Sequence, residues 1–217
     1  MAEGTDFLYP FIEGDERDAA SLLADLAVSA RAKSTESGQV RAGALARNER
    51  VLVQAVRAMA ACFGAGGRLF TFGNGGSSTD ASLLAELFAD PPRGRALPAR
   101  CLVDDAAVLT ALGNDVGFEL VFSRQLIAHA APGDIVLGCS TSGNSRNLVR
   151  AFEHARGRGM LTVATSGYDG GEIARVVDHC LIVGHDSVHR IQETQAALGL
   201  ALWDLVQRAL PAGTSNG

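Results

Sequence analysis

Two short segments of the chain combine glycine with hydroxyl and amide side chains. They are residues 73–80 (GNGGSSTD) and residues 140–145 (STSGNS). Each follows a short apolar run and precedes a segment in which apolar residues recur at helical spacing. Backbone N–H groups at the start of a helix favour an anion, glycine lets the main chain approach it, and hydroxyls add neutral donors. The two segments therefore predict an anion-binding site.

Helix capping and dinucleotide binding are the alternatives to a simple anion site. A single serine or threonine before a helix is usually an N-cap, but this concentration of hydroxyl and amide groups exceeds what one cap requires. Gly73 and Gly75 also begin the dinucleotide pattern G-x-G-x-x-G, and Asp104 ends the second apolar run as a ribose-binding acid would. Ser78 occupies the place of the third glycine, so the pattern favours a simpler anion over a dinucleotide.

The elements that position these segments follow from the pattern of apolar residues. Five short apolar runs cover about residues 68–72, 99–103, 134–139, 161–164 and 180–183. Helical segments alternate with them at about residues 77–89, 106–111 with 118–130, 145–158, 171–176 and 188–210. This alternation predicts an α/β fold with a doubly wound parallel sheet and helices on both faces. Ligands bind at the carboxyl ends of such strands, where both polar segments lie.

The N-terminal part of the chain has helical spacing over residues 15–32 and 40–63. The polar residues 33–38 between them (KSTESG) predict a break. We therefore expect an N-terminal helical extension over residues 1–39, the main domain over residues 40–210, and a disordered tail over residues 211–217.

The composition narrows the class of protein. With 217 residues, 47% of them hydrophobic and 20% charged, the chain suits one α/β domain. The net charge is -5 and no Lys/Arg run occurs, which disfavours nucleic acid as a partner. We expect no membrane association, because no apolar run reaches the length of a membrane span and no leader segment is visible. Four scattered cysteines predict buried free thiols and a reduced, cytoplasmic location.

Six motifs occur in an order that resembles the sugar isomerase (SIS) domain, in its phosphoheptose isomerase branch. The motifs lie at residues 72–77 (FGNGGS), 113–118 (GNDVGF), 122–124 (FSR), 140–145 (STSGNS), 167–171 (GYDGG) and 190–193 (RIQE). The resemblance runs from about Val51 to Val206. It implies a five-stranded parallel sheet flanked by helices, a homotetramer with sites at subunit interfaces, and conversion of sedoheptulose 7-phosphate.

The resemblance also implies a role for individual residues. A serine- and threonine-rich loop holds the phosphate in this family, and amide, hydroxyl and carboxylate side chains contact the sugar. The ligand-binding positions of this sequence are then Asn74, Gly75, Ser77, Asp115, Ser140, Thr141, Ser142, Ser145 and Gln192.

The catalytic positions of the family differ in this chain. Its enzymes carry a His and a Glu four residues apart on one helix, and a Gln and a His eight residues apart on another, and these residues bind zinc in characterised members. Gln192 is kept, but the other three positions are Leu83, Leu87 and Leu200. Leucine neither ligates zinc nor transfers a proton. We therefore expect no metal and no cofactor, and helix packing as the role of the leucines.

Three functions stay open. An isomerase would need other acid–base groups, and the candidates are Glu86 after a one-residue shift of its helix, His189 just before the RIQE motif, and Glu193 within it. A non-catalytic phosphosugar sensor would keep the phosphate loops without turnover. An interaction protein is the third, since the family includes a bacterial protein that associates with the replication initiator.

Overall fold

The computed structural model describes residues 19–210, so the predicted tail and the first residues of the predicted N-terminal helix lie outside the described residues. The first helix, α1, runs from Ala19 to Gly64. The chain divides into two compact units between Gln39 and Val40, and α1 contributes to both. No helix within residues 19–210 has the length and apolar character needed to cross a bilayer.

The prediction of a break at residues 33–38 was wrong, because α1 continues through this segment without interruption. Thr35 Oγ1 donates a hydrogen bond to the carbonyl of Arg31 at 3.1 Å, and Ser37 Oγ donates to the carbonyl of Lys33 at 2.9 Å. These hydroxyls bond one turn back along the same helix. Polar composition alone therefore did not end the helix.

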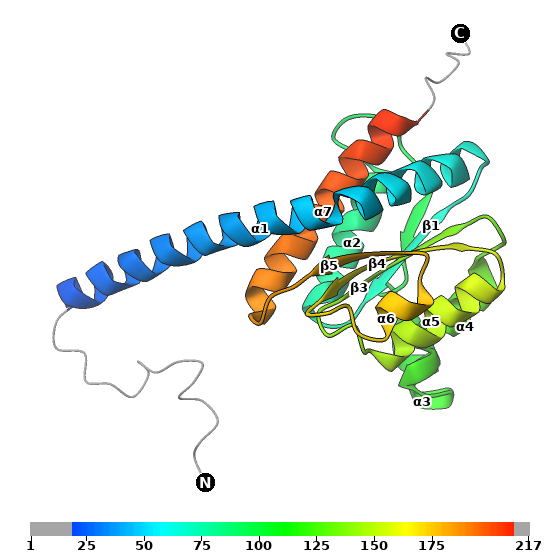
Figure 1. The fold of residues 1–217 in the computed structure, drawn as a ribbon. Coiled ribbons are helices and arrows are strands. Elements are labelled where there is room, and N and C mark those ends of the chain that lie inside the picture. Colours follow the sequence, from blue (N-terminus) through cyan, green and yellow to red (C-terminus); the bar gives the residue numbers. More distant parts are fainter. Residues whose placement is uncertain (1–18, 211–217) are drawn as a thin grey trace. The chain divides into compact units, whose positions relative to one another are not determined.

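The second unit contains a five-stranded parallel sheet, which confirms the predicted fold class (Figure 1). The strands are β1 (Leu69–Gly73), β2 (Ala99–Cys101), β3 (Ile135–Ser140), β4 (Leu161–Gly167) and β5 (His179–Val183). Their order in the sheet is β2-β1-β3-β4-β5. The chain therefore winds outward from β1 to one edge and then from β3 to the other.

Helices cover both faces of this sheet (Figure 1). They are α2 (Gly76–Ala89), α3 (Ala106–Asp115), the 3-10 helix η1 (Phe118–Leu120), α4 (Val121–His129), α5 (Arg146–Gly157), α6 (Ile173–Val176) and α7 (Val188–Ala209). One hydrophobic core joins α2, α7 and the part of α1 after residue 40 to the sheet, and a second core joins α4, α5 and α6 to the opposite face.

Alternating side chains of each strand enter the two cores. In β1, Leu69 belongs to the core of α2 and α7, whereas Phe70 and Phe72 belong to the opposite core. The Phe72 ring lies 4.9 Å from the ring of Phe122 and 5.3 Å from that of Phe152, measured between centroids. Both faces of the sheet are thus buried, as is usual for a parallel sheet.

Candidate functional site

The two polar segments follow neighbouring strands. β1 pairs with β3, and Gly73 lies opposite Cys139 in the register. The chain leaves β1 toward β2 at one edge and returns to β3 on the other side of β1. In open α/β sheets, ligands bind at the carboxyl ends of the strands where the order reverses in this way. The fold therefore places both segments at the position that most often holds a ligand.

A cavity of 170 Å³, here called the loop cavity, lies between the two segments. Its lining consists of hydroxyl, amide and thiol side chains from both loops. The lining residues are Asn74, Ser77, Cys139, Ser140, Thr141, Ser142 and Ser145. Pockets that bury drug-sized ligands span roughly 300–1,000 Å³, so the loop cavity suits a small group and not a whole sugar.

Hydrogen bonds hold the wall of the loop cavity in place. Asn74 and Asn147 exchange two amide hydrogen bonds of 2.9 Å each. The backbone N–H of Gly143 donates to Ser140 Oγ at 3.1 Å, and Gln195 Nε2 donates to the carbonyl of Ser140 at 2.8 Å. Gly143 has a positive φ of 68°, and an added Cβ would lie 2.3 Å from the carbonyl oxygen of Gly170. The tight turn of the second loop therefore requires glycine.

The serine at the start of α5 is not used as a cap. Ser145 precedes this helix, yet its side chain makes no cap hydrogen bond. Its Oγ lies 3.5 Å from the Oγ of Ser140 on the cavity wall. Helix capping therefore does not account for this hydroxyl, which is available to a ligand.

The loop cavity is electrically neutral in its side chains. Its one ionisable lining group is the Cys139 thiol, and burial, as the largest cause, raises the pKa of this thiol to about 12. The starts of α2 and α5 both lie beside the cavity, where the helix dipoles favour negative charge. An anion here would be stabilised by dipoles and hydroxyl donors and not by a side-chain cation.

Gln192 reaches the two loops from α7. Its Nε2 lies 3.4 Å from Thr141 Oγ1, and a Cβ added to Gly76 would lie 2.9 Å from the same nitrogen. The structure therefore brings Gln192 to the loops predicted to bind phosphate. Asp115 is placed differently, because it is exposed at the end of α3 and accepts a hydrogen bond from Asn114 Nδ2 at 2.8 Å.

A second opening, here called the leucine groove, has a volume of 300 Å³ and runs between α2 and α7. Most of its wall is leucine and alanine, with three charged side chains. The lining residues are Arg41, Asp80, Leu83, Leu84, Leu87, Glu193, Ala196, Ala197 and Leu200. Leu83 and Leu200 are 49% and 51% exposed. The three leucines that the resemblance assigns to the family's catalytic positions thus line one groove and give it an apolar wall.

The candidate acid–base residues lie on two helices. Glu86 is exposed on α2, while Leu83 and Leu87 of the same helix line the groove. His189 is exposed in the first turn of α7. Glu193 lines the leucine groove and forms an ion pair with Arg190. The catalytic roles of Glu86, His189 and Glu193 stay predictions.

Asp80 is a residue of this region whose chemistry the sequence did not reveal. It lies one turn after Ser77 on α2 and lines the leucine groove. Its Oδ2 atom is buried and has no hydrogen-bond partner among the described residues. Burial raises the pKa of this carboxyl group above its ordinary value. The spacing of three residues from Ser77 was the available signal, since residues three apart share a helix face.

A third opening, here called the side cavity, has a volume of 410 Å³ and adjoins the loop cavity, because Asn74 lines both. Its lining residues come from the loop after β1, from α2, from the segment that follows β2, and from α3, η1 and α4. Its lining combines hydroxyl groups and one carboxylate with aliphatic and aromatic groups. The lining residues are Gly73, Asn74, Gly75, Ser78, Thr79, Ser82, Val103, Asp104, Leu109, Phe118 and Phe122.

The residues present do not fit a zinc ion of the kind that the resemblance implies. Structural and catalytic zinc sites use three or four Cys, His, Asp or Glu ligands. The leucine groove offers only the carboxylates of Asp80 and Glu193, and no cluster of three such ligands occurs within residues 19–210. The expected absence of a cofactor stays a prediction.

Comparison with known proteins gives close relatives. A family model described as the SIS domain matches residues 35–167. A phosphoheptose isomerase of Chlorobium phaeobacteroides is 42% identical over 207 residues, which cover 92% of this chain and 88% of that protein. One from Geobacter sp. is 47% identical over 158 residues, covering 72% of this chain and 82% of that protein.

Solved structures agree with these sequence matches. The phosphoheptose isomerase GmhA from Neisseria gonorrhoeae superposes with a TM-score of 0.79 at 36% identity, covering 84% of this chain and 99% of that chain. A phosphoheptose isomerase from Francisella tularensis gives a TM-score of 0.79 at 29% identity, covering 83% and 97%.

Proposed function

The chain belongs to the SIS domain family, and from this premise we propose that it binds a sugar phosphate whose phosphate group occupies the loop cavity. The observation that carries the proposal is the loop cavity itself. Hydroxyls from two loops and the starts of two helices converge on it at the point where the strand order reverses. Its relatives are phosphoheptose isomerases, so a heptose phosphate is the first ligand to test.

In this proposal, different residues bind the phosphate group and the carbon chain of the ligand. Ser140, Thr141, Ser142 and Ser145 donate hydrogen bonds to phosphate oxygens, each of which is charge-assisted and stronger than a neutral bond. Asn74, the backbone of Gly75, and Ser77 contact the first carbons beyond the phosphate. Gln192 closes the cavity from α7, and Asp115 reaches the sugar only if the end of α3 approaches it.

Calorimetric titration with sedoheptulose 7-phosphate tests the phosphate site. We expect saturable binding, and Ser145→Ala is expected to weaken it about ten-fold, because a hydrogen bond to a charged group contributes roughly 1.5–3 kcal/mol. Ser187→Ala is the matched control, since Ser187 precedes α7 and also makes no side-chain cap bond. A full-length protein that shows no saturable heat with any sugar phosphate would refute the proposal.

Isomerisation is the second candidate function, and Asp80 is the specific observation that favours it. Aldose–ketose isomerisation moves a proton between neighbouring carbons and requires an acid–base group near them. A carboxyl with an unpartnered buried oxygen and a raised pKa has the character of such a group. Glu86, His189 and Glu193 are weaker alternatives, because two are exposed outside the groove lining and the third is paired.

Deuterium exchange separates binding from turnover. An active isomerase in D2O incorporates deuterium at the carbon next to the carbonyl of sedoheptulose 7-phosphate, and NMR detects it. If the second candidate is right, the wild-type protein exchanges and Asp80→Asn loses the exchange while keeping affinity for the ligand. Binding without exchange in the wild-type protein would rule out isomerisation and favour the non-catalytic phosphosugar sensor.

The assembly and location of the protein are part of the same proposal. We propose a homotetramer in the cytoplasm, without metal or cofactor, as the family resemblance implies. Analytical ultracentrifugation of the purified chain measures the assembly. Association with a replication initiator is the function with least support, since the loop cavity is not needed for it.

A further inference from the structure

The loop cavity leaves most of a sugar phosphate unplaced. Its volume of 170 Å³ accommodates a phosphate group and little more. Two openings lie close to it: the side cavity, which shares Asn74 with it, and the leucine groove, whose Asp80 follows Ser77 by one turn of α2. These two openings are the neighbouring spaces that can receive the carbon chain of the ligand.

The leucine groove is poorly suited to a chain of hydroxyl groups. Leu83, Leu87 and Leu200 form its wall and offer no hydrogen-bond partner. Leaving a buried hydroxyl unpaired costs about 1–3 kcal/mol, and a sugar carries several. Six of its nine lining residues are leucine or alanine, so a sugar chain here would lose hydrogen bonds that it makes in water.

The side cavity has the opposite chemistry. Ser82 Oγ donates a hydrogen bond of 2.7 Å to Asp104 Oδ1, which orients the carboxylate in the turn after β2. An ionised carboxylate has about four acceptor positions, so Asp104 can also accept hydrogen bonds from ligand hydroxyls. Ser78 and Thr79 add hydroxyls on the α2 side.

The apolar lining residues of the side cavity match the C–H groups of a sugar. Leu109 and Phe118 line it, and Phe118 is 60% exposed although it is a large aromatic residue. Sugars present C–H groups as well as hydroxyls, and an aromatic face can cover the C–H groups. A single sugar ligand would therefore explain why the exposed Phe118 and the carboxylate of Asp104 line the same cavity.

We infer that the side cavity is the subsite for the hydroxylated carbon chain of the ligand, with Asp104 as the acceptor of its hydroxyl hydrogens. This inference rests on the proposed function, because it takes the phosphate to occupy the loop cavity. It deepens that function by directing the chain away from the leucine groove. It also places the far end of the sugar away from Asp80, which favours binding over turnover.

The test compares a long and a short phosphate ester on the full-length protein. Sedoheptulose 7-phosphate fills both cavities, whereas glycerol 3-phosphate fills the loop cavity alone. By calorimetry, Asp104→Asn is expected to weaken the sugar phosphate about ten-fold and to change glycerol 3-phosphate less than two-fold. Asp90→Asn is the matched control, since Asp90 is exposed at the end of α2 and carries the same change of charge.

The outcomes separate this inference from the proposed function. Equal affinities of the wild-type protein and Asp104→Asn for the sugar phosphate would overturn the subsite and leave the phosphate site standing. Equal weakening of both esters would overturn it as well, because Asp104 would then act on the phosphate. If neither ester binds to the wild-type protein, the proposed function fails and the subsite fails with it.

Discussion

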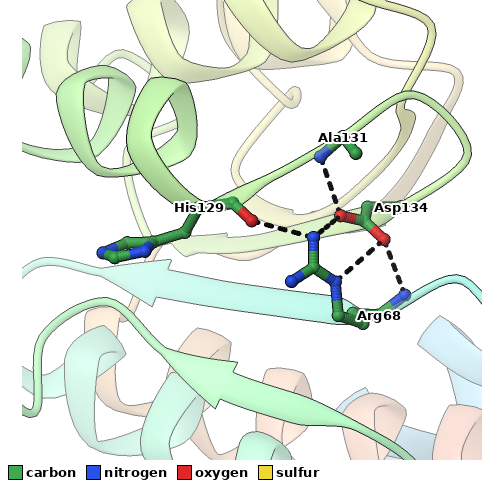
Figure 2. A network of polar contacts seen from close by, with 4 residues as sticks. All are labelled: Arg68, His129, Ala131 and Asp134. Carbon is green, nitrogen blue, oxygen red and sulfur yellow. Dashed lines mark hydrogen bonds and ion pairs between the residues drawn. The ribbon is translucent and has the colours of Figure 1, made fainter.

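The carboxylate of Asp134 connects two strands at the end of the sheet opposite the loop cavity (Figure 2). Its Oδ1 accepts from the backbone N–H of Arg68 at 2.8 Å, and its Oδ2 accepts from Arg68 Nη2 and from the backbone N–H of Ala131, each at 2.8 Å. The same Arg68 nitrogen donates to the carbonyl of His129. Burial alone would raise the pKa of Asp134, but these donors outweigh it and hold the pKa below its usual value.

Replacing this carboxylate changes stability in a pH-dependent way. We expect Asp134→Ala to lower the free energy of unfolding at pH 7 by about 2 kcal/mol, because it leaves buried donors unpaired. A carboxyl whose pKa is lower in the folded state stabilises above its unfolded pKa of about 3.9, and this contribution is lost as the pH falls through the folded pKa. Urea unfolding at a series of pH values measures it.

The control for this prediction is Asp134→Asn, which keeps the shape and one acceptor oxygen and should lose less stability at pH 7. The difference between Asp134→Ala and the wild-type protein should shrink as the pH falls below about 4. A constant difference from pH 7 to pH 3 would show that the charge of Asp134 contributes nothing.

The sequence alone predicts some residues of the candidate site and not others. The loops of the loop cavity were predictable, because glycine and hydroxyl side chains before a helix have a local meaning. Asp80 was not, because the burial of its Oδ2 and the lack of a hydrogen-bond partner among the described residues are properties of the folded domain. The side cavity was not predictable either, since it joins the ends of β1 and β2 to η1.

Among the elements, α1 offers a direct test of why a polar segment stays helical. Gly38 lies within α1, and an added Cβ would meet no atom within 4 Å. Glycine in a helix interior is roughly 0.5–1 kcal/mol less favourable than alanine. We therefore expect Gly38→Ala to increase the hydrogen-exchange protection of amides around residues 33–39, as measured by mass spectrometry.

Gly38→Pro is the opposing control, because proline removes a helix hydrogen bond and costs about 3 kcal/mol or more. It should reduce protection in the same segment. Unchanged protection in both variants would mean that α1 does not persist through residue 38 in solution.

A run of apolar residues does not always give the correct end of a strand. The apolar run of residues 161–164 predicted a strand that ends at residue 164. In the structure, β4 continues to Gly167. Thr165 and Ser166 are buried within it, and Ser166 Oγ donates a hydrogen bond of 3.1 Å to the carbonyl of Gly170. The Ser166 hydroxyl thus finds a partner that the folded chain provides, and the sequence pattern does not contain that partner.

At the scale of the domain, the candidate site and the centre of the core share the same strands. β1 and β3 carry the two loops of the loop cavity, and Phe72 of β1 packs between Phe122 and Phe152 in the core beneath. A ligand that joins the two loops must therefore stabilise the fold of the domain and not only the loops. Thermal unfolding reports this linkage.

We expect sedoheptulose 7-phosphate at 100 times its dissociation constant to raise the free energy of unfolding by about 2.7 kcal/mol. In a chain of this size, that corresponds to a rise of about 5–10 °C in Tm.

Phe152→Leu should lower the Tm of the free protein, because it removes packing against Phe72, but the ligand should stabilise it by the same free energy. Ser145→Ala should keep the Tm of the free protein and lose about half of the ligand-induced increment at the same ligand concentration, because ten-fold weaker binding leaves about 1.4 kcal/mol of stabilisation. An increment lost in Phe152→Leu and kept in Ser145→Ala would place the ligand away from the loop cavity.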